Sequence, residues 1–507
     1  MSDATESVTP QPRTDGLRGL AGRLTPGVLL IGLAFALMLP LIVRRGGDPD
    51  FFSHLRTAQA IIDMGGVPHH ELFTYTLSDR TWVDHEYGSE LLMFWLPNLI
   101  HGMGAISLAY GVLIALGFVF VLLRINLRRT PAAITAAALL FGALVGVGIW
   151  GPRSQTVTFT MVCLTLYLID RYLRRGSRAI YFLPLAVVLW ANMHAGFVFG
   201  PFLVAVAAGA ELILWLVHRE QRHHLLAFRG LVIVCGLCLV AGLITPYGPQ
   251  LYWYVWATQT SKALPLFVAE WQAPDFHQIR FVPFELSLLL LCIGLVFRRP
   301  RLHELLMLAV TLLLALFALR NIAIFLAVAT PILAWSYADA WHSLGFEARV
   351  GPWLRRRAGD LRVLAAMTLV VAVAAMALVV DDQLSGQAAA TRANFPVAAM
   401  DWLAARPNVG TRMFNSDEWT GYIVYRLYPA ASRRVFALGD PTIGGDAYLY
   451  QYLDVTELDS DWQKLLDSYG VDYVIFEPST PLAAALDESS SWQRVYQDDI
   501  AAIWLRR

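Results

Sequence analysis

Two short polar segments between residues 44 and 103 contain side chains that could exchange protons or hold a metal. Their acids and histidines are Asp48, Asp50 and His54 in the first segment, and Asp84, His85 and Glu86 in the second. A carboxylate can take a proton from a hydroxyl group, and carboxylates with imidazoles can coordinate a divalent metal. Charged groups are costly in a bilayer unless they face water or a functional cavity. Both segments therefore indicate chemistry at the aqueous edge of a membrane.

The first segment also has a structural interpretation, and the sequence leaves the choice open. Asp48 precedes Pro49, an arrangement that suits a helix N-cap. Asp50 and His54 are four residues apart, so on a helix they share a face and could form an ion pair. The functional alternative is a carboxylate base held by its neighbours.

The second segment offers three adjacent candidates, Asp84, His85 and Glu86. Adjacent residues on a regular element point in different directions, so at most two of the three can reach one site. Their types suit a metal ligand or an acid–base group. Their spacing is diagnostic of neither use, so both stay open.

Three further polar turns follow apolar runs on the same predicted side of the membrane. Their candidate residues are Arg153, Asn192 with His194, and Arg320, which precedes Asn321. An arginine at this depth can hold a phosphate in a bidentate manner, or it can extend to the lipid headgroups. Asn192 and His194 can bind a substrate or form a hydrogen bond between helices. Because three separate turns deliver polar groups to one face, we expect a common site there.

The composition is that of a polytopic membrane protein. Of the 507 residues, 57% are hydrophobic and 15% are charged, and the formal net charge is zero. We expect about eleven spans, at residues 26–43, 104–123, 131–149, 156–172, 180–192, 197–217, 230–245, 282–297, 305–319, 321–337 and 363–380. The four cysteines lie in apolar runs, which argues against disulfides. No phosphate-binding glycine loop, GxSxG or HExxH motif occurs, and no basic stripe indicates nucleic acid.

The distribution of arginine and lysine predicts the orientation of the chain. The predicted inner segments carry 21 of these residues and the predicted outer segments carry 8. An excess of positive charge marks the cytoplasmic side. The N-terminus is therefore expected in the cytoplasm and, after eleven spans, the C-terminus outside. The weakest assignment is 305–337, because one long helix through Arg320 and Asn321 would remove a span and reverse the C-terminus.

The chain divides into three parts: a cytoplasmic tail at 1–25, a membrane domain at 26–380 and an extracytoplasmic domain at 381–507. Two outer loops are long, at 44–103 and 246–281. We expect helices near Pro49–Met64 and Tyr87–Ile100 in the first loop. The second loop is rich in tryptophan and tyrosine, which suits an aromatic belt at the bilayer surface or a lid over a lipid substrate.

The last 127 residues change character, because charge rises and long apolar runs end. Expected strands at Arg433–Leu438 and Val471–Phe476 alternate with expected helices at Pro396–Ala405 and Asp461–Tyr469. This alternation predicts a small α/β unit. The predicted fold class is a polytopic α-helical membrane protein with a C-terminal soluble α/β domain.

These segments together resemble the GT-C superfamily of integral-membrane glycosyltransferases, and in particular a bacterial branch of it. The resemblance covers nearly the whole chain and is carried by residues 47–54, 67–68, 73–76, 82–86, 152–155, 190–196, 320–321, 415–422 and 469–474. It implies a sugar donor linked to polyprenyl phosphate and bound from the membrane. It also implies an acid of the first outer loop near the reacting atoms, which maps onto Asp48 or Asp50. The usual Asp-Glu or Glu-x-Asp pair reads Asp48-Pro49-Asp50 here. Some members of the superfamily use a divalent metal and others do not.

The leading hypothesis is a glycosyltransferase of the bacterial inner membrane. It would move a sugar from a polyprenyl-phosphate-linked donor to a hydroxyl group of an extracytoplasmic glycan, lipid or protein. Asp48 or Asp50 would act as the base, and Glu86 would position the acceptor or a metal. Substrate binding would fall to His54, Asp84, His85, Arg153, Asn192, His194 and Arg320. The polar loops at 415–422 and 439–446 would shape acceptor access.

Two alternatives come from other classes of protein. One is a non-catalytic envelope-assembly protein, and the other is a transporter or flippase of a lipid-linked saccharide. Most charges lie at span ends rather than at mid-span, which disfavours transport.

Overall fold

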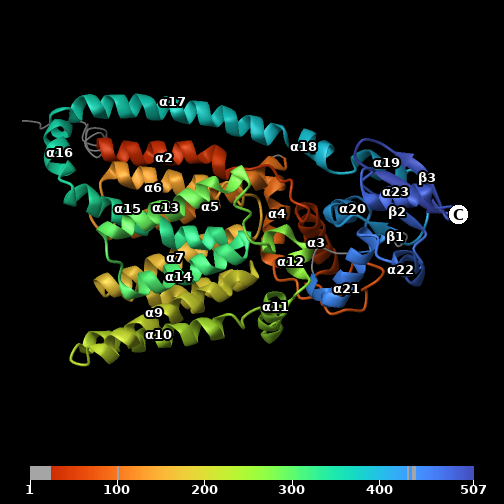
Figure 1. Ribbon diagram of the computed structural model, residues 1–507, viewed down its shortest axis with the longest axis horizontal. Coiled ribbons are helices and arrows are strands. Elements are labelled where there is room, and N and C mark those ends of the chain that lie inside the picture. The colour runs from red at the N-terminus through yellow and green to blue at the C-terminus, as the bar shows by residue number, and fades with distance from the viewer. Residues whose placement is uncertain (1–23, 100–101, 431–432, 437–440) are drawn as a thin grey trace, which may run out of the picture.

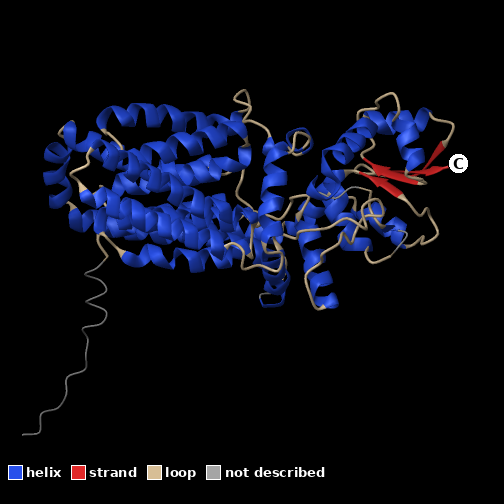
Figure 2. Cartoon of the chain, turned by 90° about the horizontal axis from the view of Figure 1, so that it is seen from below, coloured by secondary structure: helices blue, strands red, loops and turns tan. Residues whose placement is uncertain are grey.

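The computed structural model describes residues 24–99, 102–430, 433–436 and 441–507. Its helices form an elongated bundle, and a smaller domain that contains the sheet lies at one end of the bundle (Figures 1 and 2). We call that end of the bundle the outer end and the opposite end the inner end. Most of the predicted cytoplasmic tail, residues 1–23, lies outside the described residues.

All eleven predicted spans are helical. Their helices are α2 (Pro26–Ile42), α5 (Gly104–Ile125), α6 (Ala132–Val145), α7 (Gln155–Arg175), α8 (Leu183–Ala191), α9 (Phe199–Val217), α10 (Arg222–Ala241), α13 (Val282–Phe297), α14 (Leu302–Phe317), α15 (Ile322–Ser343) and α17 (Ala358–Ser385). Short 3-10 turns, η1 (Arg178–Phe182), η2 (Ala195–Val198) and η4 (Ile279–Phe281), precede α8, α9 and α13. In the described part of the chain, seven of these helices are long and apolar enough to cross a membrane, and four are shorter. The predicted class of polytopic helical protein is confirmed.

The assignment at 305–337 is decided by a break in the backbone. Ala318 is extended, with φ −148° and ψ 130°, and the 3-10 turn η5 (Leu319–Asn321) separates α14 from α15. The Asn321 amide donates to the carbonyl oxygen of Leu314 at 3.1 Å and closes the turn. Two helices therefore replace one long helix, and Arg320 lies at the outer turn between them.

A buried ionic cluster joins four helices at the inner end. Arg124 Nε on α5 lies 2.5 Å from Asp170 Oδ2 on α7, and Arg298 lies 2.6 Å from Glu304 Oε2 on α14. The ring of Trp335 on α15 lies 5.6 Å and 4.9 Å from the guanidinium carbons of Arg124 and Arg298. Removing one partner of a buried ion pair costs about 3–5 kcal/mol. The cluster thus holds the helices together at the end where no site is expected.

Both helices predicted in the first outer loop are present. They are α3 (Phe51–Met64) and α4 (Tyr87–Leu99). Gly65 ends α3 in the left-handed conformation, with φ 70°, which favours glycine. The second outer loop forms α11 (Pro249–Thr260), α12 (Leu264–Phe267) and η3 (Ala269–Trp271), which lie between the bundle and the C-terminal domain in Figure 1.

The helix α16 (Phe346–Arg356) lies before α17 at the inner end of the bundle. The C-terminal domain is an α/β unit, as predicted. Its helices are α18 (Gln387–Asn394), α19 (Val397–Ala404), η6 (Asp417–Trp419), α20 (Thr420–Leu427), α21 (Pro441–Thr456), α22 (Trp462–Ser468) and α23 (Pro481–Glu488). Its strands are β1 (Met413–Asn415), β2 (Tyr473–Phe476), β3 (Trp492–Gln497) and β4 (Ala502–Arg506), in the order β1-β2-β4-β3. β1 is parallel to β2, and the other two pairs are antiparallel.

The strand predicted at Arg433–Leu438 is wrong for its described part, residues 433–436. Val435 does not join the sheet but pairs with the first outer loop, donating to Phe73 O at 3.1 Å and accepting from Tyr75 N at 3.3 Å. Val435 does form β-type backbone hydrogen bonds, as its residue type favours, but its partner is the first outer loop and not a neighbouring strand of the sheet. This pairing ties the C-terminal domain to the first loop.

A close helix contact strengthens this tie. Gly421 on α20 packs against the start of α3, where an added Cβ would lie 2.3 Å from Pro49 O and 3.0 Å from Ser53 N. Beside it, the rings of Phe52 and Tyr422 meet edge to face at 4.9 Å. Only glycine fits at this position, so the domain lies directly on the polar segment that begins at Asp48.

We expect Gly421→Ala to loosen the C-terminal domain, because the new methyl group would collide with backbone atoms that cannot give way. Overpacking of this kind costs about 1–3 kcal/mol. The measurement is thermal unfolding in detergent together with the rate of limited proteolysis between α18 and α19. Gly236→Ala is the control, since nothing lies within 4 Å of an added Cβ there. Equal unfolding temperatures for the two variants would contradict the tight contact.

The orientation of the chain is a separate prediction from the charge asymmetry of 21 inner to 8 outer basic residues. A reporter fused after residue 381 should be active outside the cytoplasm, and one fused after Arg357 should be active inside. The two fusion points flank the span α17. A cytoplasmic reporter at residue 381 would overturn the eleven-span arrangement.

Candidate active site

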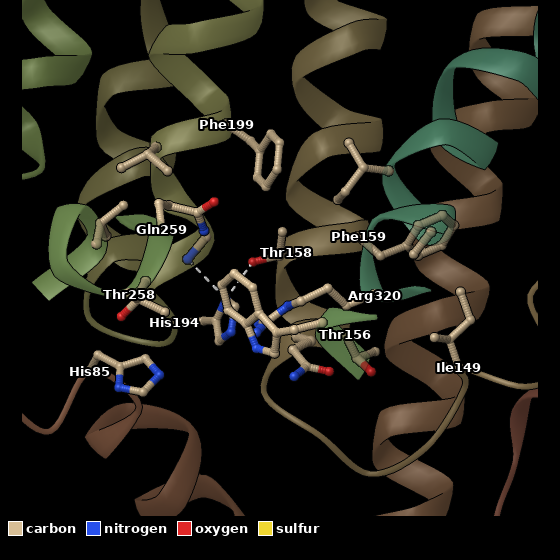
Figure 3. Close-up of a pocket in the computed structure, with 18 of the residues that line it drawn as sticks. His85, Ile149, Thr156, Thr158, Phe159, His194, Phe199, Thr258, Gln259 and Arg320 are labelled. Atoms are coloured by element: carbon tan, nitrogen blue, oxygen red, sulfur yellow. Dashed lines mark hydrogen bonds between the residues drawn. The ribbon is translucent and has the colours of Figure 1, made fainter. Parts of the chain in front are cut away.

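A cavity of about 120 Å³ lies where the outer ends of the spans meet the two outer loops (Figure 3). Its polar lining includes His85, Gln155, Thr158, His194, Tyr254 and Arg320. These residues come from the first outer loop, from α7, from the turns before α9 and α15, and from α11. The separate outer turns predicted from the sequence thus meet at one place.

Glu86 lies at the centre of three histidines beside this cavity. Its Oε1 is 3.0 Å from His85 Nε2 and 3.4 Å from His194 Nε2. Its Oε2 is 3.3 Å from His54 Nε2. The ring of His85 in turn stacks on Tyr254, with 4.2 Å between ring centroids. The structure therefore brings together four residues that are 140 positions apart at the extremes.

Three buried acids of the first loop differ in their charge. Burial alone would raise the pKa of Glu86, but the three histidines, led by His85, hold it well below its usual range. Burial and then the charge of Glu86 raise the pKa of Glu90 well above its usual value. Burial and then the charge of Glu90 do the same for Asp84. The ionised form is therefore favoured at Glu86, and the protonated form is favoured at Glu90 and Asp84.

His194 has a defined tautomer because two donors face its Nδ1. Thr158 Oγ1 accepts from Trp190 Nε1 at 2.9 Å and lies 2.7 Å from His194 Nδ1. The backbone N–H of Gly196 donates to the same Nδ1 at 2.9 Å. Burial lowers the pKa of His194 to about 3, so the imidazole is neutral. Its proton is then on Nε2, which faces Glu86.

Among the residues that the structure describes, two groups offer donors that could suit a metal. They are His85, Glu86 and His194 beside the cavity and Asp170, His303 and Glu304 at the inner end. In the first group the Nε2 of His194 presents a proton rather than a lone pair to Glu86. In the second group the carboxylates are already paired with arginines, whose charge would repel a cation. In this structure a proton on His194 and the arginines beside Asp170 and Glu304 take the places that a cation would need.

We therefore expect divalent metals not to stabilise the protein. Protein that binds a metal in the folded state alone unfolds at a higher temperature when the metal is added. After dialysis against EDTA, addition of Mn²⁺ or Mg²⁺ should leave the unfolding temperature unchanged. Glu86→Gln is the control. A rise seen for the natural sequence and absent from Glu86→Gln would establish a metal at this carboxylate.

Asp48 and Arg153 are already engaged with protein groups. Asp48 Oδ1 accepts from the backbone N–H of Asp50 at 2.9 Å, as an N-terminal cap does, and Oδ2 pairs with Arg153 Nε. Arg153 also pairs with Glu270 of the second outer loop. This arginine thus joins the two loops between two carboxylates, which suits a positioning role better than a phosphate clamp.

Asp50 is the exposed residue directly before α3. Burial and then the charge of Asp50 raise the pKa of Asp417 to about 8. The charge of Asp50 also acts on Glu90 and Arg320. Asp50 thus lies within electrostatic reach of a neutral acid on one side and a guanidinium on the other.

Arg320 differs from Arg153 in its surroundings. Its guanidinium carbon lies 4.6 Å from the centre of the Trp271 ring, and the side chain lines the cavity with His85 and His194. No carboxylate oxygen of the described residues lies within 4.0 Å of it. A cation in so enclosed a place calls for an anion, and the cavity is where one could lie.

Asn192 makes its hydrogen bonds within the protein. Its amide nitrogen donates to Val188 O at 2.7 Å and to Ile244 O at 2.8 Å, and its side-chain oxygen accepts from the Tyr87 hydroxyl. Its carbonyl accepts from Gly88 N at 3.1 Å. Asn192 therefore joins α8 to the start of α4 and helps to position Glu86.

No protein-family model matches the chain, and no curated protein matches its sequence. Solved structures match it in three dimensions. ArnT from Cupriavidus metallidurans bound to undecaprenyl phosphate matches with a TM-score of 0.51 and 12% identity, over 94% of this chain and 97% of that chain. Apo ArnT matches with a TM-score of 0.50 and 14% identity, over 97% and 98%. The archaeal oligosaccharyltransferase AglB from Archaeoglobus fulgidus, in complex with an inhibitory peptide and a dolichol-phosphate, matches with a TM-score of 0.53 and 13% identity, over 89% and 69%.

The chain has the GT-C fold. Identities of 12% to 14% make this a likeness of architecture, and the predicted resemblance is confirmed at that level.

Four residues at or beside this site were not singled out from the sequence as site residues: Glu90, Tyr254, Glu270 and Asp417. Glu90 carried a signal, because it follows Glu86 by four residues at the start of a predicted helix. Asp417 carried a weaker one, since it lies in the polar loop at 415–422. Tyr254 and Glu270 carried none beyond their place in an aromatic loop. Asp440, in the other polar loop, lies outside the described residues.

Proposed function

We propose that this protein is a membrane glycosyltransferase that moves a sugar from a polyprenyl-phosphate-linked donor to an acceptor hydroxyl group outside the cytoplasm. The observation that carries the proposal is Arg320, an enclosed guanidinium without a carboxylate partner among the described residues, in a cavity at the outer end of a GT-C bundle. A lipid phosphate is an anion that lies at this depth. The neighbours ArnT and AglB have undecaprenyl phosphate and dolichol-phosphate in their structures.

The reaction that fits this geometry breaks the bond between the sugar and the lipid phosphate. The acceptor oxygen attacks the anomeric carbon, and its proton passes to the carboxylate of Asp50. The phosphate leaves with the bonding electrons, and Arg320 stabilises its negative charge. His85 and His194 offer the cavity imidazole edges oriented by Glu86, and these can hold sugar hydroxyl groups.

Asp50 is preferred to Asp48 as the base because of their contacts. Both carboxylate oxygens of Asp48 are assigned, one to the cap of α3 and one to Arg153. Asp50 is the more exposed of the two, and its charge acts on both Arg320 and Asp417 of the C-terminal domain. The base must reach the acceptor, and the acceptor must enter from the water side.

The test is deletion of the gene in its native host, with mass spectrometry of envelope glycans and of lipid-linked sugars. We expect one glycan feature to disappear and its polyprenyl-phosphate sugar to accumulate. The natural gene should restore both, and the Asp50→Asn gene should restore neither. Restoration by Asp50→Asn but not by Asp48→Asn would make Asp48 the base, and restoration by both variants would point to a non-catalytic assembly protein. Accumulation of the donor on the cytoplasmic side of the membrane would point to a flippase.

A further inference from the structure

A second groove lies beside the cavity, between α11 of the second outer loop and α21 of the C-terminal domain. Its volume is about 250 Å³, and its lining includes Trp253, Trp256, Thr258, Thr442, Gly445 and Asp446. We call it the tryptophan groove. Thr258 also lines the cavity described above. The two spaces therefore meet at one side chain, and a chain-like ligand could occupy both.

One wall of the tryptophan groove is an exposed aromatic surface. Trp253 and Trp256 are 69% and 63% exposed. They are three residues apart on α11 and so lie on one face of the helix. No indole N–H of this pair makes a hydrogen bond to a described residue. A flat apolar ring with a donor at its edge matches a sugar ring, which has an apolar C–H face and a rim of hydroxyl groups.

The opposite wall is polar and belongs to the domain outside the spans. Gly445, with φ 74°, interrupts α21 and brings Asp446 to the groove. Asp446 Oδ1 accepts from Ser261 Oγ at 2.5 Å, and Oδ2 accepts from Lys262 N at 2.9 Å. These hydrogen bonds, led by that of Ser261, lower the pKa of Asp446.

The ionised Asp446 ties the second outer loop to the C-terminal domain and keeps acceptor capacity for further donors. A carboxylate has about four lone-pair directions, and two of those at Asp446 are used by Ser261 and Lys262. Hydroxyl groups are donors of the right kind for the remainder. An aromatic wall that faced lipid would lie opposite apolar groups, whereas this one faces a carboxylate and threonine.

We propose that the tryptophan groove is a carbohydrate-binding subsite for the acceptor glycan. Sugar rings stack on Trp253 and Trp256, and their hydroxyl groups donate to Asp446. The reacting end passes Thr258 into the cavity that holds Arg320. This assignment rests on the proposed function for the direction in which the glycan enters, and its test is separable from the test of that function.

The experiment measures binding of the full-length protein in detergent to a printed array of bacterial envelope oligosaccharides. We expect the natural sequence to bind a subset of them. Trp253→Ala and Trp256→Ala should each bind that subset about tenfold more weakly, and the phenylalanine variants should keep most of the affinity. Trp353→Ala is the matched control, because Trp353 is 55% exposed but lies on α16 at the inner end.

Absence of array binding by the natural sequence, or equal binding by the tryptophan variants, would overturn the subsite and leave the test of glycosyl transfer untouched. A second measurement addresses the bilayer. In nanodiscs of phosphatidylcholine brominated near the headgroup, the fluorescence contributed by Trp253 and Trp256, taken as the difference from the double phenylalanine variant, should not be quenched. Strong quenching would make both residues bilayer anchors and would also overturn the proposal.

Discussion

Asp50→Asn is expected to lower glycosyl transfer by about 10²- to 10⁴-fold, the usual contribution of a general base. The amide of asparagine has nearly the shape of the carboxylate but cannot take the acceptor proton. Binding of undecaprenyl phosphate should be retained, because Arg320 is unchanged. Transfer is measured with purified protein, a radiolabelled polyprenyl-phosphate sugar and envelope extract as the acceptor source.

Asp63→Asn is the matched control for this variant. Asp63 lies on the same helix α3, exposed, and its Oδ1 accepts from the Gln59 amide at 2.7 Å. Asp48→Asn is the informative comparison, because asparagine can still cap α3 through its side-chain oxygen. We expect Asp48→Asn to lose less activity than Asp50→Asn. The reverse order would make Asp48 the base.

Arg320→Ala is expected to weaken binding of undecaprenyl phosphate by about 10- to 100-fold, since hydrogen bonds to charged groups contribute about 1.5–3 kcal/mol each. The affinity of Arg320→Lys for undecaprenyl phosphate should lie between those of the natural sequence and Arg320→Ala, because lysine keeps the charge but cannot form the bidentate hydrogen bonds of arginine. Binding is measured as the rise in unfolding temperature with added lipid phosphate. The folded state should tolerate the change, because Arg320 contacts the Trp271 ring rather than a carboxylate of the described residues.

Arg280→Ala is the control for the phosphate site. Arg280 is another outer arginine, exposed, with its guanidinium 4.9 Å from the Phe281 ring centre. It should bind lipid phosphate as the natural sequence does. Arg153→Ala is expected to destabilise the contact of the two outer loops more than it weakens lipid binding. Normal binding by Arg320→Ala together with lost binding by Arg153→Ala would move the phosphate site to Arg153.

The helices were predictable because their signals are local. An apolar run in lipid must form its backbone hydrogen bonds internally as a helix, so all eleven segments could be located from hydropathy. The break at Ala318 was not evident from the sequence, because residues 316–323 contain no proline or glycine and only two polar residues, Arg320 and Asn321. In the structure the Asn321 side-chain amide donates a hydrogen bond to Leu314 O and closes the turn. This bond can form only when the turn has brought the two residues together.

The strands of the C-terminal domain were less predictable. Val471–Phe476 was expected as a strand and forms β2, whereas the pairing of Val435 with the first loop was not expected. A short run of β-forming residues does not specify its partner, because backbone donors and acceptors are the same everywhere. The three remaining strands were not predicted at all.

The sequence by itself determined which residues are chemically costly in this membrane protein, and so which ones to consider. His54, Glu86, His194 and Arg320 stand out because charge and hydrogen-bonding groups must be compensated near a bilayer. The tertiary structure alone decided their states and pairings. In the folded protein Arg153 forms ion pairs with two carboxylates, whereas Arg320 lines the cavity. Three histidines surround Glu86. These differences arise from contacts across hundreds of residues, and electrostatic energies depend on distance and burial, which no local pattern of residues encodes.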